Sequence, residues 1–220
     1  MRPLEEGLRK GLLALELPLD DVQIGRLLDY LELIQKWTKV YNLTAVRDPA
    51  EMLTHHLLDS LAAIGPLRRQ VAAMPALAGQ TKIRLLDVGS GAGLPGAVIA
   101  ICCPEFVVDC VDTVGKKAAF IQQVAVSLKL PNLRGVHARV ENLTQQYDIV
   151  SSRAFASLVD FTSWSVAALA EQGAWMGMKG KHPADEMAAL RNTVEVFHVE
   201  PLVVPGLDAE RCIVWMRRKG

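Results

Sequence analysis

Closely spaced glycines follow a short apolar segment, an arrangement that could hold the polar end of a ligand. The apolar segment spans 83–88 and ends with Asp87 and Val88. Glycine lets the backbone turn tightly and lets a ligand approach the chain without a Cβ in the way. The glycines concerned are Gly89, Gly91, Gly93 and Gly96.

Two kinds of ligand-binding loop fit this spacing. Gly91-x-Gly93-x-x-Gly96 matches the dinucleotide fingerprint, a weak match by itself. Asp87-x-Gly89-x-Gly91-x-Gly93 matches the loop with which methyltransferases bind S-adenosylmethionine (AdoMet). Only the second interpretation gives Asp87 a role, because its carboxylate can organise the loop and interact with the cationic methionine end of AdoMet, directly or through water. It predicts cofactor contacts from Asp87, Gly89, Ser90, Gly91 and Gly93.

A second acid supports an adenosine-containing cofactor. Asp112 ends the next apolar segment, 106–112, and follows Gly93 by 19 positions. A carboxylate at this place accepts hydrogen bonds from ribose hydroxyls. Two alternatives remain open. Asp87 and Asp112 could serve only as caps and turns, or the chain could be a dehydrogenase, although we identify no residues for hydride transfer.

The segments around the expected site narrow the range of chemical groups that could accept the methyl group. Methylation of an exocyclic amino group usually goes with an Asn-Pro-Pro-Tyr-like loop after the fourth strand, but 151–155 lacks a proline pair. Carbon methylation of cytosine needs a Pro-Cys nucleophile, which is also absent. Ring nitrogens such as guanine N7, hydroxyl groups and small molecules remain. Guanine N7 needs no general base, so an enzyme would mainly hold the two reactants in line.

Several cations follow predicted strand ends and would lie on one rim of the sheet. They are Arg139, Arg153, Lys179, Lys181 and His182. Together they could form a positively charged surface at the entrance of the site, where RNA would bind, although the net charge of the chain is zero. Asn42, His56, Asp59 and Ser60 could line the mouth of the cleft, where they would contact RNA or hold the loop, or they could be ordinary helix caps and core hydrogen-bonding groups. The histidines and cysteines lack metal-ligand spacing, so we expect no metal.

Alternating strands and helices must position these residues. Strands are predicted at 83–88, 106–112, 133–138, 147–151, 173–178, 194–204 and 211–216. Helices are predicted at 116–128, 158–170 and 183–191. This order predicts an α/β fold with a mostly parallel, seven-stranded, Rossmann-like sheet. No helix separates the last two strands, so they should form an antiparallel hairpin at one edge.

The first 80 residues read as helices, so we divide the chain into a helical extension, 1–80, and a methyltransferase domain, 81–220. Asp20 and Gln23 form a capping-box pattern at the start of one helix. Another helix should begin after Asp48 and stop near Pro66, leaving 70–82 as a short helix or linker. The extension would cover the cleft.

The amino-acid composition is typical of a folded, globular protein. Of the 220 residues 50% are hydrophobic and 22% are charged, which excludes a disordered chain. The balance of 24 basic and 24 acidic residues argues against a protein that simply coats nucleic acid. The four cysteines are typical of buried, reduced thiols. With no signal-peptide pattern and no long apolar run, we expect a soluble, cytoplasmic monomer.

Taken together, these segments resemble the RsmG (GidB) family of rRNA methyltransferases. The resemblance runs from Ile24 to Arg217 and is carried by several motifs beside the glycine loop. They are Tyr41-Asn42-Leu43-Thr44-Ala45-Val46-Arg47-Asp48-Pro49, His56-Leu57-Leu58-Asp59-Ser60, Ser152-Arg153-Ala154-Phe155-Ala156, Lys179-Gly180 and Glu210-Arg211. The family methylates N7 of one guanine in the 530 loop of bacterial 16S rRNA with AdoMet, releasing S-adenosyl-L-homocysteine.

The resemblance also implies roles for single residues. Gly89 and Leu94 would line the cofactor, Asp112 would bind its ribose, and Val140 and Glu141 would meet its adenine. Arg153 would reach the cofactor and the reaction centre, and with Lys179 it is the predicted catalytic pair. The predicted RNA contacts are Asn42, His56, Arg139, Lys179 and Lys181. The acceptor would be 16S rRNA, within the small subunit or an assembly intermediate.

Overall fold

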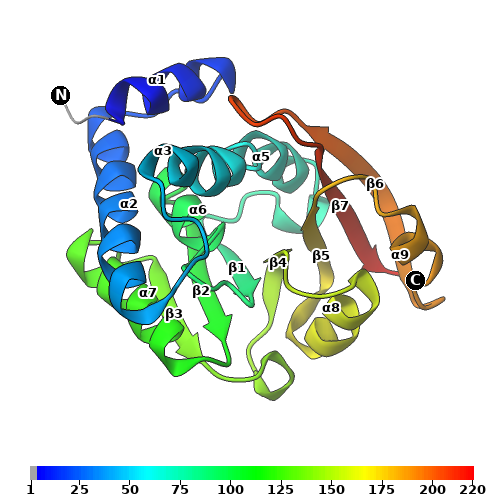
Figure 1. Cartoon of the computed structure of the whole chain (residues 1–220). Helices are drawn as coiled ribbons and strands as arrows, with labels where there is room; N and C mark the ends of the chain where they lie inside the picture. The colour runs from blue at the N-terminus through cyan, green and yellow to red at the C-terminus, as the bar shows by residue number, and fades with distance from the viewer. Residues whose placement is uncertain (1–3) are drawn as a thin grey trace.

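A seven-stranded sheet runs through the middle of the computed structural model, which describes residues 4–220 (Figure 1). The strand order is β3-β2-β1-β4-β5-β7-β6. The strands are β1 Ile83–Val88, β2 Phe106–Asp112, β3 Leu133–His137, β4 Tyr147–Arg153, β5 Leu169–Lys179, β6 Val194–Leu202 and β7 Arg211–Arg218. Six of the seven begin at the residue that the sequence predicts, and β5 begins four residues earlier.

The parallel part of the sheet brings the predicted site together. β1 pairs in parallel with β2 on one side and with β4 on the other, so the carboxyl ends of these strands lie at one edge. The chain moves outward from β1 through β2 to β3 and then returns to the other side of β1. Ligands of open α/β sheets bind at such a reversal of strand order.

The last two strands form the antiparallel hairpin that the sequence predicts. β7 lies between β5 and β6 and pairs antiparallel with both. Because β7 runs against β5, its first residue, Arg211, lies at the same edge as Lys179, the last residue of β5. The hairpin therefore adds a residue to the ligand-binding edge.

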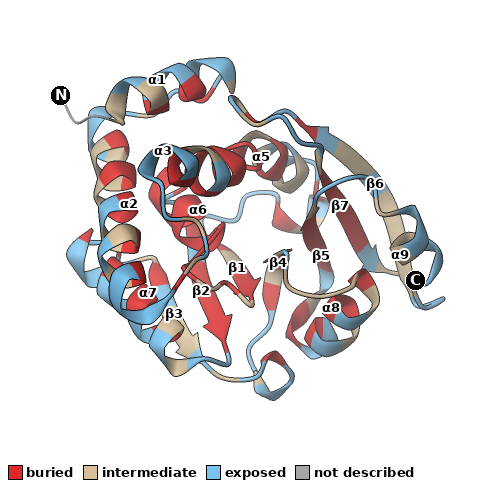
Figure 2. Ribbon diagram, viewed as in Figure 1, coloured by how far each residue is buried: buried red, intermediate tan, exposed pale blue. Residues whose placement is uncertain are grey.

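Helices cover both faces of the sheet, and one apolar core lies on each face. Helix α6 (Gly96–Cys102) and helix α7 (Gly115–Ser127) share the larger core with the N-terminal helices. Helix α8 (Leu158–Ser165) packs on the smaller core, and α9 (Ala184–Ala188) lies beside it. Helix α6 is buried over its whole length, whereas α9 has no buried residue (Figure 2).

The N-terminal helices begin where their capping residues predict. Asp20 and Gln23 form a capping box ahead of α2, in which the Gln23 N–H donates to Asp20 Oδ1 over 2.7 Å. Asp48 caps α3 by accepting a hydrogen bond from the Glu51 N–H over 3.0 Å. The helical segments are α1 Glu5–Ala14, α2 Asp21–Tyr41, α3 Pro49–Met52, a π-helix Leu53–Leu58, α4 Asp59–Leu61, α5 Ile64–Ala72 and a 3-10 turn Pro75–Leu77.

Several predicted boundaries differ from the structure. Pro66 lies in the first turn of α5, where proline is tolerated because the N–H it lacks has no helical partner. The helix therefore continues to Ala72, into the stretch 70–82 that was predicted as a short helix or linker. α8 ends at Ser165 and β5 begins at Leu169, inside the predicted helix 158–170. β4 extends two residues further than predicted, to Arg153.

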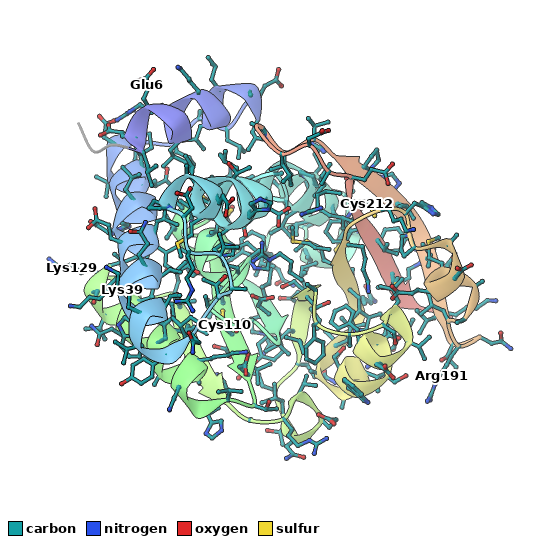
Figure 3. The ribbon with its side chains drawn as sticks, viewed as in Figure 1. Glu6, Lys39, Cys110, Lys129, Arg191 and Cys212 are labelled. Carbon is teal, nitrogen blue, oxygen red and sulfur yellow. The ribbon has the colours of Figure 1, made fainter. Side chains whose placement is uncertain are left out.

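The cysteines are free and buried, as predicted. Cys110 lies in β2 and Cys212 in β7 (Figure 3). Within residues 4–220, no helix combines the length and the apolar character needed to cross a lipid bilayer. Over the same range, no three His, Cys, Asp or Glu side chains are grouped to hold a metal ion. The expectation that the chain has no signal peptide rests partly on residues 1–3, which lie outside the described range.

Candidate active site

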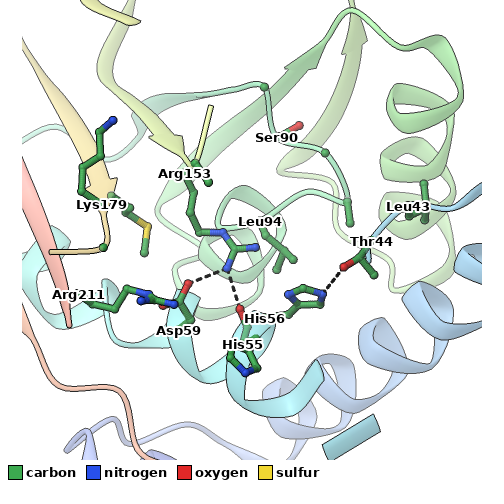
Figure 4. A pocket seen from close by; sticks show the side chains of 16 residues that line it. Leu43, Thr44, His55, His56, Asp59, Ser90, Leu94, Arg153, Lys179 and Arg211 are labelled. Atoms are coloured by element: carbon green, nitrogen blue, oxygen red, sulfur yellow. Dashed lines mark hydrogen bonds and ion pairs between the residues drawn. The ribbon is translucent and has the colours of Figure 1, made fainter. Parts of the chain in front are cut away.

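Two cavities lie along the carboxyl edge of the sheet and share Gly89 and Ala154 as walls. We name them the arginine cavity, which contains Arg153 and has a volume of about 440 Å³, and the Asp112 cavity, of about 630 Å³. The two cavities adjoin at these shared residues beside the glycine loop, and we refer to them together as the cleft. Figure 4 shows the arginine cavity.

The glycine loop has the backbone that its sequence predicts. Gly89, Gly91 and Gly93 have φ angles of +65°, +59° and +88°, in the left-handed region that side chains disfavour. A Cβ at Gly89 would also lie 2.0 Å from Cδ2 of Phe155. Ser90, Gly91 and Leu94 line the arginine cavity beside Gly89. The loop thus presents its backbone to the cleft.

Asp87 lies beneath this loop and is fully buried. Its carboxylate accepts hydrogen bonds from the Gly96 N–H over 2.9 Å and from the Ser151 hydroxyl over 3.0 Å. Burial raises the pKa of Asp87 to about 7, although these two bonds oppose the shift. The side chain lines neither cavity. Its geometry fits the first role predicted for it, which is to organise the loop.

Asp112 lies at the floor of the Asp112 cavity, where the predicted ribose contact needs it. Oδ2 accepts the Gly91 N–H over 3.1 Å, and Oδ1 accepts the Val114 N–H over 2.9 Å. Lys117 Nζ lies 3.7 Å from Oδ2. Each carboxylate oxygen has two lone pairs. Both oxygens therefore keep one acceptor position for a ligand hydroxyl.

The residues after β3 line the far wall of the Asp112 cavity. Val140 is buried at the start of a 3-10 turn, Val140–Asn142, and Glu141 follows it. Arg139 is exposed, and its Nη2 lies 3.3 Å from Glu141 Oε1. An apolar side chain next to a carboxylate suits an adenine ring and its amino group. The predicted adenine contacts therefore lie in the same cavity as Asp112.

Two aromatic residues of this cavity were missed by the sequence analysis. Phe155 and Trp164 meet edge to face, with their ring centroids 5.8 Å apart. Phe155 follows Ala154, whose φ of +50° turns the chain back over Gly89. Its place two residues after the predicted site residue Arg153 was the available signal.

In the arginine cavity, Arg153 is held by acceptors from the N-terminal helices. Its Nη1 donates to Asp59 Oδ2 over 2.7 Å and to the His55 carbonyl over 2.9 Å (Figure 4). Arg211 Nε donates to the other Asp59 oxygen over 2.8 Å. Arg211 was not among the predicted site residues, and Asp59 was considered only for the mouth of the cleft. Both belong to segments that carry the family resemblance, but nothing in their spacing shows that they meet.

His56 is buried in the wall of the same cavity. Its Nε2 lies 2.8 Å from the Thr44 hydroxyl. Burial, followed by the nearby Arg153 cation, lowers the pKa of His56 from 6.5 to about 4. The imidazole is therefore neutral at pH 7. The prediction that it contacts RNA is compatible with its place in the cavity.

Lys179 lines the arginine cavity, but its ammonium group is already paired. Nζ donates to the Ala156 carbonyl and to Glu186 Oε2, each over 2.8 Å. It points away from Arg153 in Figure 4. An ammonium group has three N–H donors, so one remains for the catalytic and RNA-binding roles predicted for Lys179.

Two predicted RNA contacts lie outside both cavities. Asn42 ends α2 in a left-handed conformation, with φ at 51°, and its Oδ1 accepts a bond from Arg47 Nη2 over 2.6 Å. This is the helix-cap alternative that the sequence left open. Lys181 is exposed in the loop after β5. Contact with RNA remains a prediction for both.

The sheet order, the glycine loop after β1 and the buried acid that ends β2 define a class I AdoMet-dependent methyltransferase. TrmN from Thermus thermophilus shares this fold with a TM-score of 0.56 and 18% identity, over 76% of this chain and 53% of its own. Ribosomal protein L11 methylase from Lactobacillus delbrueckii subsp. bulgaricus gives a TM-score of 0.52 and 14% identity, over 74% of this chain and 77% of its own.

The chain belongs to the rRNA small subunit methyltransferase G family (GidB), whose sequence model matches residues 23–214. A ribosomal RNA small subunit methyltransferase G from Polaromonas sp. is 68% identical over 219 residues, covering 100% of this chain and 96% of the relative. Its namesake from Albidiferax ferrireducens is 69% identical over 221 residues, covering 99% of each. The predicted family, fold class and AdoMet cofactor are thereby confirmed.

Proposed function

We propose that this protein transfers a methyl group from AdoMet to N7 of a guanine in the 530 loop of 16S rRNA. The observation that carries the proposal is full-length similarity to rRNA small subunit methyltransferases G, together with a cleft that has separate places for a nucleoside and for a second ligand. The coarser activity, rRNA methylation, rests on the relatives. The choice of guanine N7 rests on the family resemblance and on the chemistry of the cleft.

Each of the two cavities would hold a different part of the cofactor. Asp112 would accept the ribose hydroxyls, with Val140 and Glu141 beside the adenine. The backbone of Gly89, Ser90 and Gly91 would hold the chain that leads to the sulfonium. Arg153 and Leu94 would contact the methionine end. When bound, AdoMet supplies an electrophilic methyl group on a sulfonium sulfur, and the remaining arginine cavity would take the acceptor base.

The charges around this cavity suit N7 as the acceptor. Guanine N7 carries a lone pair at neutral pH, so no residue has to remove a proton, and methylation leaves the ring cationic. His56 is neutral at pH 7 and does not oppose that charge. Arg153 is held by Asp59 over 2.7 Å, which keeps a counter-charge beside the guanidinium. Arg153 would orient a phosphate or guanine O6 without covering N7.

The RNA would reach the cleft over its rim. Arg139 and Lys181 are exposed there and would contact phosphates. The helical extension, 1–80, would cover the arginine cavity and contribute to substrate choice, because Leu43, Thr44 and His56 already form part of its wall. We propose 16S rRNA in the small subunit or an assembly intermediate as the partner of a cytoplasmic monomer.

Methyl transfer to defined RNAs tests this function. Labelled AdoMet is incubated with the enzyme and with 16S rRNA or 30S particles that lack the modification, and tRNA and 23S rRNA serve as controls. The methylated position is then mapped by chemical cleavage at 7-methylguanine. One cleavage in the 530 loop supports the proposal. Incorporation elsewhere refutes the assigned site, and binding of AdoMet without incorporation into any RNA favours a small-molecule acceptor.

A further inference from the structure

The Asp59 carboxylate holds two arginines that come from different strands. Its side chain is 3% exposed. Oδ2 lies 2.7 Å from Nη1 of Arg153, at the end of β4, and Oδ1 lies 2.8 Å from Nε of Arg211, at the start of β7. Each carboxylate oxygen therefore serves one guanidinium.

The chain delivers Asp59 through an unusual helical turn. Asp59 directly follows the π-helix Leu53–Leu58. The His55 carbonyl of that π-helix also accepts a hydrogen bond from Arg153 Nη1, over 2.9 Å. One short segment thus holds a single guanidinium nitrogen with two acceptors. π-helical turns occur frequently at functional sites, and this one lines the arginine cavity.

The cluster is both charged and directional. Two arginines and one carboxylate leave a net charge of +1. Within residues 4–220, the hydrogen bonds of Arg153 use only Nη1, and those of Arg211 use Nε and Nη1. Each arginine keeps further N–H donors next to the cavity that both of them line. The position of the Asp59 carboxylate determines where those donors point.

We propose that Asp59 is a positioning residue for methyl transfer: it aims the free donors of Arg153 and Arg211 at acceptor oxygens of the bound substrates. Asp59 touches no reactant itself. The inference rests on the proposed function in that the arginine cavity takes part in the reaction. It requires neither N7 as the acceptor nor the 530 loop as the site.

Asp59→Asn tests the role, with Asp109→Asn as a matched control. Asp109 is also 3% exposed and also holds an arginine, since Arg134 Nε donates to its Oδ1 over 2.9 Å. It lines neither cavity. Asp59→Asn leaves the guanidinium groups of Arg153 and Arg211 facing a neutral amide. Asp109→Asn does the same to the more exposed guanidinium of Arg134, so each variant loses a buried carboxylate that pairs with arginine.

The decisive comparison is between turnover and RNA binding. The turnover number is measured on undermethylated 30S particles with both substrates saturating. RNA affinity is measured across a salt series, and thermal unfolding is followed for each variant. Asp59→Asn should lower the turnover number about 100-fold, because misdirected groups cost about that much, while Asp109→Asn stays within about twofold. RNA affinity should not weaken, and its logarithmic salt slope should steepen by about one as the cluster charge rises to +2.

Two results would overturn the proposal. One is an equal loss of turnover in both variants, which would follow stability alone. The other is RNA affinity that falls in parallel with turnover. If Asp59→Asn does not fold, Asp59→Glu replaces it, because this variant keeps the charge but moves the carboxylate by one bond. Its turnover number should fall about tenfold. A turnover number equal to that of the wild type would refute the positioning role. Because every comparison is made with the wild type, an unexpected methylation site in the wild type leaves this test valid.

Discussion

Removing the Asp112 carboxylate is the most direct test of the cofactor half of the cleft. Asp112→Ala deletes the two acceptor positions left for the ribose hydroxyls, and it also releases the N–H groups of Gly91 and Val114. The anchor on Gly91 belongs to the glycine loop, so part of the loss reaches the cofactor indirectly. Both effects weaken AdoMet binding.

The geometry sets the size of this loss. A hydrogen bond to a charged group contributes about 1.5–3 kcal/mol, and water can replace part of it in an open cleft. We expect AdoMet affinity to fall by about 1.5–3 kcal/mol, or roughly 10- to 100-fold in Kd. Isothermal titration calorimetry measures the Kd, and urea unfolding measures stability, which should fall by about 1–2 kcal/mol.

Asp148→Ala provides the control. Asp148 also accepts a backbone N–H, from Arg84 over 2.8 Å, but it does so at the opposite edge of the sheet, where β1 and β4 begin. It should lower stability by about 1 kcal/mol and leave the AdoMet Kd unchanged. An unchanged Kd in Asp112→Ala, with the expected loss of stability, would refute the ribose role and reduce Asp112 to a loop anchor.

Three other changes probe the rest of the cleft. Gly89→Ala should destabilise the protein by about 1–2 kcal/mol because of its positive φ, and calorimetry should show weaker AdoMet binding because the new Cβ displaces Phe155. Arg153→Ala should lower the turnover number on 30S particles about 100-fold and change the melting temperature little, since Asp59 keeps Arg211 as a partner; unaltered turnover would exclude Arg153 from the site. Because the folded-state pKa of His56 is depressed to about 4 from 6.5, its neutral form contributes stability above pH 6.5 that is lost as pH falls through 4. Relative to His56→Gln, urea unfolding of the wild type should therefore lose up to about 3 kcal/mol over that window, and parallel profiles would refute the shift.

The sequence predicts the sheet well because its strands are short, buried and separated by clear turn signals. The runs Ile83–Val88 and Phe106–Asp112 have the predicted bounds. Glycine spacing and the acid that follows β2 likewise predict one side of the cleft. All of these signals are local, since each motif lies within one strand–loop–helix unit.

The arginine side of the cleft depends on contacts between distant segments, so sequence patterns could not reveal it. Asp59 meets Arg153 and Arg211 across 94 and 152 positions. The π-helix that places Asp59 has no simple periodic signature, and its sequence reads as part of an ordinary amphipathic helix. The same limit applies to Lys179, whose pairing with Glu186 depends on where α9 packs against the end of β5.

Three aspartates around the cleft show how environment gives one side chain different tasks. Asp87 faces only neutral donors in a fully buried place, which raises its pKa to about 7 and suits it to hold a loop without a fixed charge. Asp112 accepts two backbone N–H groups beside an open cavity, so it can accept hydroxyl groups as well. Asp59 is enclosed by two guanidinium groups, one on each carboxylate oxygen, so its proposed influence on the reaction passes through the arginines that it orients.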